Sequence, residues 1–319
     1  MSINEDDVGK VVAYNPEDKH FVSISQEREP LTDELIVKCI KKQMNNESFV
    51  HLDQESLADL AQSIRDQKPP SKMKLKGIYK RVNELLDKYR YRYFETEDPK
   101  TSMVPCTYPD PTEKQNNRYY VVGPSGAGKS WTCARMLTVH KKLYPKAEIF
   151  LFTVHDNDPS LDDKIKNIQR IKLDDSFLKA YANKQPYKPA DFAANEDSQN
   201  CILFDDIDNI PNLQIRKLVA NLRDSCLTES RHHNCTIYTI SHDVLGGLRT
   251  KSSIQNSTHI IAFPNMGAKS QIRRFLKIYM NLPEDTIDRM VDEKLNSRWI
   301  MVGKSSPPYC LYEHGLFLI

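Results

Sequence analysis

A glycine-rich octapeptide placed directly after an apolar run constrains this chain more than any other feature. Gly123-Pro-Ser-Gly-Ala-Gly-Lys129-Ser130 follows the run Tyr-Tyr-Val-Val. Such a loop curls round a phosphate group and points several N–H groups at it, while the N-terminus of the next helix adds its positive dipole. Lys129 is then expected to bridge the β- and γ-phosphates of ATP, and the Ser130 hydroxyl to ligate Mg²⁺. The motif predicts a phosphate-binding P-loop, whose expected nucleotide contacts are Gly123, Pro124, Ser125, Gly126, Ala127, Gly128, Lys129, Ser130 and Trp131.

A second motif supplies carboxylates at the end of a buried strand. Asn200-Cys-Ile-Leu-Phe-Asp205-Asp206 has four apolar residues and then two acids, as a Walker B strand does. Parallel sheets place ligands at the carboxyl ends of their strands, so we expect Asp205 to hold Mg²⁺ and Asp206 to orient the attacking water or act as base. A turn or a helix cap would explain the acids equally well in isolation, but the P-loop upstream favours the catalytic interpretation.

Composition argues against a secreted, a membrane-spanning and a zinc-binding protein. The 319 residues are 39% hydrophobic, which suffices for a core, and the net charge of +2 leaves nucleic-acid binding to local basic clusters. Seven cysteines without paired spacing are typical of buried thiols in a reducing compartment and do not suggest a zinc site. No apolar run reaches about 18 residues, and the N-terminus is polar. We therefore expect a soluble, non-secreted protein without a membrane span.

The sequence pattern divides the chain into an N-terminal region, a linker and a larger C-terminal domain. Residues 1–98 show helical periodicity, as in 31–44 and 57–65, and predict a small helical N-terminal region. Residues 72–92 carry eight Lys/Arg against two acids and form one apolar face, which predicts an amphipathic basic helix. A solvated surface is the simpler interpretation of those charges, with contact to DNA or to an acidic protein as the alternative. The proline-rich residues 99–117 are expected to form a linker.

Residues 118–319 show α/β alternation and predict a P-loop ATPase domain: a three-layer α/β/α core with a mainly parallel sheet. Residues 182–199, poor in apolar side chains, are expected to be a surface insertion. C-terminal helices and terminal strands complete the domain. The expected core strands are 118–122, 148–154, 200–205, 235–241 and 259–263; the expected later elements are helices at 268–281 and 284–295 and apolar stretches at 299–302 and 309–319.

The spacing of the motifs narrows the class of P-loop protein. Some 75 residues separate Lys129 from Asp205, as expected when an extra strand lies between the P-loop strand and the Walker B strand. Small-molecule kinases and GTPases usually place those two strands side by side, and the guanine-reading motif Asn-Lys-x-Asp is absent. The strand 235–241 ends at His242, a candidate sensor of the γ-phosphate or the attacking water. An ordinary loop histidine is the alternative.

Taken together, these segments resemble the FtsK/HerA superfamily of P-loop ATPases, in particular the genome-packaging ATPases of poxviruses, other large DNA viruses and virophages. The resemblance covers about residues 118–264. It depends on the P-loop, on Ile-Leu-Phe-Asp-Asp, on Glu229-Ser-Arg231-His232 ahead of the sensor strand, and on the later Arg249 and Asn256. Two positions depart from the family pattern: His242 stands where Gln is frequent, and Asp206 stands where many related motors have Glu.

The resemblance implies an oligomeric ring, a pentamer or hexamer, that hydrolyses ATP with Mg²⁺ and threads double-stranded DNA into a preformed capsid. The implied partners are double-stranded DNA and capsid or capsid-vertex proteins, and the implied location is the virion and the assembly site in the host cytoplasm. Arg231 becomes the candidate arginine finger acting on a neighbouring subunit. Arg249 and Asn256 are weaker candidates for phosphate sensing or for the subunit seam.

Other functions remain open at this level. A helicase or a nucleotide kinase would share the same motifs, and a non-enzymatic scaffold could use bound ATP only for assembly. The chain also offers surface cations that could face DNA, although a solvated helix surface explains each of them. These are Lys251, Lys269, Arg273 and Arg274.

Overall fold

The computed structural model describes residues 2–4, 10–17, 19–25, 31–46, 53–66, 68–87, 93–96, 101–107, 116–183, 187–244, 248–266, 269–291, 295, 297–304 and 308–319. Within these ranges ten strands form one sheet in the order β4-β14-β13-β12-β11-β6-β10-β9-β7-β8. The parallel strands are β6 (Arg118–Val122), β7 (Ile149–Thr153), β8 (Ile168–Lys172), β9 (Asn200–Asp205), β10 (Cys235–Ser241) and β11 (His259–Ala262).

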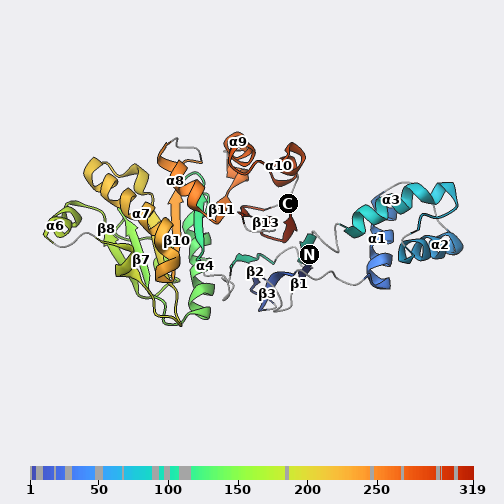
Figure 1. The fold of residues 1–319 in the computed structure, drawn as a ribbon, viewed down its shortest axis with the longest axis horizontal. Coiled ribbons are helices and arrows are strands. Elements are labelled where there is room, and N and C mark those ends of the chain that lie inside the picture. Colours follow the sequence, from blue (N-terminus) through green and yellow to red (C-terminus); the bar gives the residue numbers. More distant parts are fainter. Residues whose placement is uncertain are drawn as a thin grey trace.

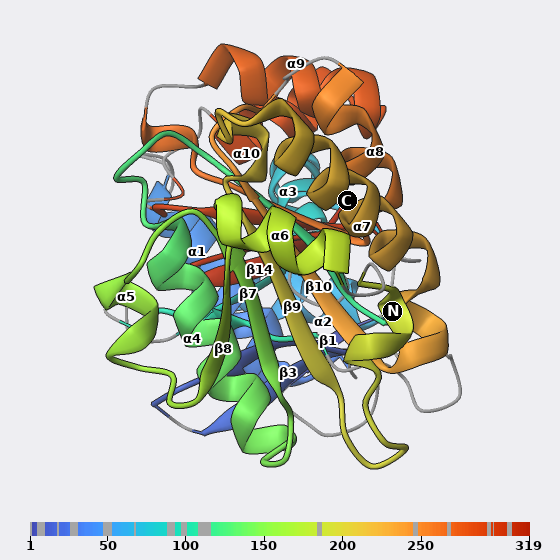
Figure 2. The same ribbon diagram turned by 90° about the vertical axis from the view of Figure 1, so that its left-hand side faces the viewer.

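Helices cover both faces of this sheet. On one face lie α4 (Lys129–Leu143), which shares an apolar cluster with Tyr119 and Val121 of β6, and α5 (Pro159–Asp162), which packs on α4. On the other face lie α6 (Asp175–Asn183), α7 (Leu213–His233) and α8 (Leu248–Asn256). Figure 2 shows α4 and α5 on one side of the strands and α7 and α8 on the other. Strand β10 lies between the P-loop strand β6 and the Walker B strand β9. The predicted three-layer fold and the extra strand are both confirmed.

The C-terminal elements extend the same sheet with antiparallel strands. Helices α9 (Lys269–Tyr279) and α10 (Glu284–Val291) form as predicted, and an ion pair between Arg273 and Asp288 joins them. β12 (Ile300–Gly303), β13 (Tyr309–Tyr312) and β14 (Gly315–Leu318) follow, and β4 (Tyr93–Glu95) pairs with β14. The domain sheet therefore takes a strand from before residue 118.

Two expectations need correction within residues 118–319. Sequence reasoning missed β8, because its side chains alternate irregularly and are only half-buried at the edge of the sheet. The expected surface insertion contains a short 3-10 helix, Pro189–Phe192. Its Phe192 is 2% exposed and packs against Phe150 and Phe152, so part of this segment belongs to the core.

The expectation of a wholly helical N-terminal region is wrong for its first 25 residues. β1 (Ser2–Asn4), β2 (Lys10–Asn15) and β3 (His20–Ser25) form a small antiparallel sheet with β5 (Val104–Pro105). Val12, Val22 and Ile24 of this sheet are buried in the same cluster as α4. In Figure 1 the small sheet lies beside α4. Residues 12–15 of β2 are all buried, so this strand lacks the alternation of buried and exposed side chains that marks a half-buried strand in a sequence.

The predicted helices do form a bundle. α1 (Asp33–Asn46), α2 (Gln54–Arg65) and α3 (Met73–Asp87) share a separate apolar cluster, and Figure 1 shows them at one end of the molecule. The apolar face predicted for the basic helix is confirmed, since Leu75, Val82 and Leu86 are each at most 2% exposed. Residues 88–92 of the expected helix lie outside the described residues.

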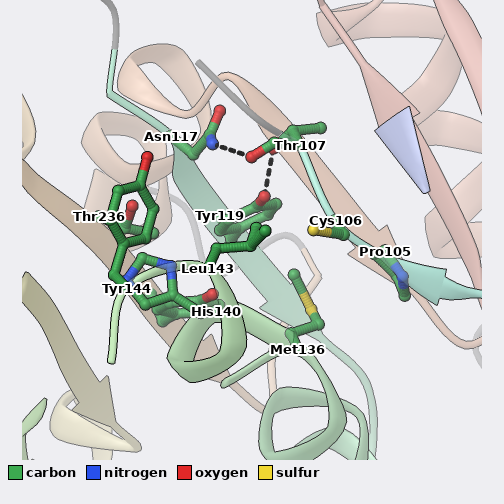
Figure 3. Close-up of a pocket in the computed structure, with 11 residues that line it drawn as sticks. Pro105, Cys106, Thr107, Asn117, Tyr119, Met136, His140, Leu143, Tyr144 and Thr236 are labelled. Carbon is green, nitrogen blue, oxygen red and sulfur yellow. Dashed lines mark hydrogen bonds between the residues drawn. The ribbon is translucent and has the colours of Figure 1, made fainter. Parts of the chain in front are cut away.

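Part of the expected linker is packed against the core. Among residues 101–107, Met103 and Val104 are buried. Figure 3 shows how Thr107 is held: its carbonyl accepts a hydrogen bond of 2.7 Å from the Asn117 amide, and its hydroxyl bonds to the Tyr119 hydroxyl. These contacts surround a small cavity at the N-terminal ends of β6 and β10. Residues 101–107 thus connect the N-terminal sheet to α4 through packing contacts. Residues 97–100 and 108–115 lie outside the described part.

Two further expectations concern burial and membranes. All seven cysteines lie buried, as predicted for thiols of a reducing compartment. Among the described residues, no helix combines the length and the apolar character needed to span a bilayer.

Candidate nucleotide site

The P-loop connects β6 to α4 in a conformation that its glycines permit. Gly126 and Gly128 have φ angles of 77° and 96°, in the left-handed region that other residues rarely adopt. Gly123 lies against Phe263, and a Cβ at this glycine would stand 3.0 Å from a ring carbon of that phenylalanine. The glycine spacing is therefore required by backbone geometry and by the packing of the loop on the residue after β11.

Lys129 begins α4 and folds its ammonium into the loop. Its Nζ donates hydrogen bonds to the carbonyl oxygens of Gly123 at 2.8 Å and Pro124 at 3.1 Å. Burial lowers the pKa of Lys129, and the carboxylates of Asp205 and Asp206 partly oppose that shift. The cation is thus desolvated and positioned at the loop, as expected for a group that binds phosphate oxygens.

Asp205 ends β9 and is buried beside the P-loop. Thr153, at the end of β7, donates its hydroxyl to Oδ2 of Asp205 at 3.2 Å. Burial raises the pKa of Asp205, and repulsion from Asp206 adds to the rise while the Thr153 hydroxyl opposes it. A buried carboxylate whose ionised form is disfavoured suits a divalent cation, and Mg²⁺ needs few protein ligands because phosphate oxygens and waters complete its shell. Ser130 and Asp205 therefore fit the predicted metal site. Such a site needs no cluster of three ionisable ligands, and the described residues contain no cluster of that kind.

Asp206 and His242 meet Lys129 at the same edge. Nε2 of His242 lies 3.3 Å from Oδ2 of Asp206, and Nδ1 lies 3.1 Å from Nζ of Lys129. Lysine can only donate, so Nδ1 of His242 accepts from Lys129 and the ring proton lies on Nε2, the nitrogen nearer to Asp206. Asp206 has a φ of 51° and also accepts from the Asn209 amide at 2.7 Å. His242 is thus more than a loop histidine: it bridges the two predicted catalytic groups.

Sequence reasoning missed several members of this site. Thr153 and Asn209 bond to the two carboxylates, and Phe263 supports the loop. Thr153 lies at the end of the predicted strand 148–154, at the same edge of the sheet as Asp205, so its place in the sequence could have indicated a role in the site. Phe263 likewise ends the predicted strand 259–263, whereas the sequence gave no signal for Asn209.

The remaining candidates lie elsewhere. Arg231, in the last turn of α7, is exposed and contacts the His232 ring at 3.2 Å. It precedes β10, whose seven residues place it about 20 Å from the P-loop edge. Asn256 ends α8 near the same far edge, where its carbonyl accepts a bond of 2.6 Å from Arg118. Arg249 lies in the first turn of α8, close in sequence to His242. Among the candidates whose side chains the structure describes, His242 is the one that contacts Lys129.

Strand order and loop geometry together define a P-loop NTPase fold. No family model matches the chain. The uncharacterized protein V3 of Sputnik virophage is 32% identical over 259 residues, which cover 79% of this chain and 95% of the virophage protein. At that identity and coverage, the chain belongs to the same family as this virophage protein. The predicted kinship with virophage proteins is confirmed.

Two solved structures to which the chain shows a distant similarity are named as an NTPase and an ATPase. The genome packaging NTPase B204 from Sulfolobus turreted icosahedral virus 2, in complex with ATP-gammaS, is 14% identical with a TM-score of 0.39, and the match covers 62% of this chain and 96% of B204. The cytoplasmic domain of the type VII secretion ATPase EccC from Thermomonospora curvata is 11% identical with a TM-score of 0.41, over 62% of this chain and 25% of that protein.

Proposed function

We propose that this chain is the ATP-hydrolysing subunit of a ring motor that moves double-stranded DNA into a preformed viral capsid. The observation that carries the proposal is the convergence of Lys129, Asp205, Asp206 and His242 at the P-loop edge of the sheet. Membership of a virophage protein family supports the viral context. The ring would be a pentamer or hexamer, acting at the assembly site in the host cytoplasm and at the capsid vertex.

The chemistry needs positioning and charge neutralisation more than covalent steps. Lys129 would hold the β- and γ-phosphate oxygens, while Ser130 and Asp205 would hold Mg²⁺, which neutralises developing charge on those oxygens. Asp206 would align the attacking water or take its proton. His242 keeps Asp206 and Lys129 in register through its two ring nitrogens.

Arg231 is proposed as the finger that completes a neighbouring subunit's site. It cannot serve its own P-loop, because the full length of β10 separates the two. Within the described part of the chain no carboxylate forms an ion pair with Arg231. Its charge repels that of Arg118 and contributes to the lowered pKa of that residue, after burial. An exposed cation of this kind is suited to an anion on another subunit.

DNA contacts are proposed for the exposed cations of α3, among them Lys76, Lys80 and Arg81. Arg273 is less suited to this role, since Glu284 and Asp288 already hold it. Lys251, Lys269 and Arg274 are exposed and remain surface candidates.

The deciding experiment measures ATP hydrolysis by the purified protein with and without double-stranded DNA. DNA-stimulated hydrolysis without strand separation supports a packaging motor. Strand separation would instead identify a helicase, phosphate transfer to a nucleotide would identify a kinase, and absence of turnover would leave an assembly scaffold.

Mixing two inactive variants tests the finger. Lys129→Ala should abolish turnover in its own site, and Arg231→Ala should abolish turnover in its neighbour's site. Mixed rings contain composite sites with an intact P-loop and an intact finger, so they should regain hydrolysis. If mixed rings form and show no activity above either parent, Arg231 is not the finger and Arg249 is the next residue to test.

A further inference from the structure

The strand order fixes the direction in which a bound nucleotide would lie. Asp205 ends β9 and His242 follows β10, so the γ-phosphate side of the P-loop faces those strands. β11 and β12 lie on the other side of β6. A nucleotide whose γ-phosphate lies toward β9 and β10 would place its ribose and base on that second side. Ile300 of β12 pairs with Ala262 at the P-loop end of β11, so the residues just before β12 stand where the base emerges.

A stacked arginine occupies this position. Arg298 immediately precedes β12, and its guanidinium carbon lies 4.5 Å from the ring centroid of Trp131, the residue after Ser130. Glu313 fixes the plane of the guanidinium: its Oε1 accepts from Nε at 2.9 Å and from Nη2 at 2.8 Å. Its Oε2 accepts from the Arg298 backbone N–H at 2.6 Å. The guanidinium is therefore held by contacts on its edge and on one face.

The outer side of this guanidinium remains accessible. The Arg298 side chain is 59% exposed, whereas that of Glu313 is 5% exposed. Two more cations, Arg135 and Lys164, each lie 4.8 Å from the Trp131 ring centroid. Three cations thus surround one indole and one carboxylate. Burial, followed by repulsion from Arg135, lowers the pKa of Lys164, which agrees with a surplus of positive charge.

We propose that Arg298, backed by Trp131, is the platform on which the nucleobase of the bound nucleoside triphosphate stacks. A flat guanidinium that is already oriented loses little entropy when an aromatic ring covers it. Its Nε and Nη2 donors are directed at Glu313, so Arg298 senses the face of the base and not its edge. It should therefore contribute equally to the affinity for ATP and for GTP. This inference rests on the proposed function only in requiring a nucleotide at the P-loop.

Equilibrium binding to the full-length protein in Mg²⁺ tests the platform, with ATP, GTP and inorganic tripolyphosphate as probes. Tripolyphosphate occupies the loop without a base. Arg298→Lys keeps a cation beside Glu313 but removes the plane; Arg298→Ala removes both, and thermal unfolding checks that each variant is folded. We expect both variants to bind ATP and GTP about tenfold more weakly, as loss of one cation–π stack implies, and to bind tripolyphosphate like the wild type.

The outcomes separate this inference from the proposed function. If the wild type binds all three probes and Arg298→Lys matches it on each, the platform is refuted while the P-loop assignment stands. Equal losses for ATP and tripolyphosphate would also refute stacking, because they would show a general charge effect. A wild type that binds none of the probes would overturn the proposed function and this inference with it.

Discussion

His242 offers the sharpest test of the catalytic geometry. Its Nδ1 accepts from Lys129 and its Nε2 lies 3.3 Å from Oδ2 of Asp206, so truncation to alanine removes a hydrogen bond to a cation and a close polar contact with a carboxylate. Hydrogen bonds to charged groups are worth about 1.5–3 kcal/mol each. If only one of the two acts in the transition state, His242→Ala should lower kcat about 10- to 150-fold. ATP binding should change less, since Lys129 keeps its bonds to the loop.

The matched variant is His242→Gln. A glutamine amide can also donate to Asp206 and accept from Lys129, so this variant should show a turnover between those of the wild type and His242→Ala. Phosphate release under saturating Mg²⁺-ATP gives kcat, and equilibrium titration gives affinity. Turnover of His242→Ala within twofold of wild type would refute the bridging role. Equal losses in both variants would refute the tautomer assignment.

Three further predictions concern other ionisable side chains. Asp205→Asn should stabilise the nucleotide-free protein at neutral pH, because burial raises the pKa of Asp205 and its ionised form is costly. It should also lose the Mg²⁺-ATP stabilisation, about 2.7 kcal/mol at a ligand concentration of 100 Kd, in thermal unfolding. Burial lowers the pKa of His259 from 6.5 to about 3. As the pH falls below 6.5, this histidine therefore becomes protonated in the unfolded chain but stays neutral in the native state. This costs about 2 kcal/mol at pH 5, so His259→Phe should unfold at lower pH in an acid titration monitored by circular dichroism. Replacing Lys76, Lys80 and Arg81 by glutamine should weaken DNA binding and flatten its salt dependence; an unchanged slope would leave those charges as solvated surface.

Sequence patterns predicted the elements whose signal is local. The P-loop strand, the Walker B strand and the strand before His242 are short apolar runs followed by polar groups, and all three lie at one edge of the sheet. The basic helix was predicted for the same reason, since its apolar residues recur at helical spacing along a single segment. Such features depend on neighbours in sequence, and a single chain suffices to reveal them.

Long-range contacts could not be predicted in this way. Residues 10–15 pair with residues 20–24 in a hairpin and with residues 104–105 on their other edge, and the second pairing joins segments about 90 residues apart. The Arg298–Glu313 pair and its packing on Trp131 join segments more than 160 residues apart. Polar composition made residues 99–117 resemble a linker, although burial of residues 101–107 depends on α4 beneath them.

The position of Arg231 bears on how subunits would assemble. The P-loop occupies the carboxyl edge of the parallel strands, and Arg231 occupies the amino edge. If Arg231 acts on another subunit, two different surfaces must meet, and the contact is head-to-tail. A head-to-tail contact closes into a ring when its rotation divides a full turn and otherwise gives an open filament, whereas a contact between identical surfaces ends at a dimer. The opposed edges of this one sheet therefore make the finger and the ring a single proposal: evidence for a twofold dimer as the active species would count against both.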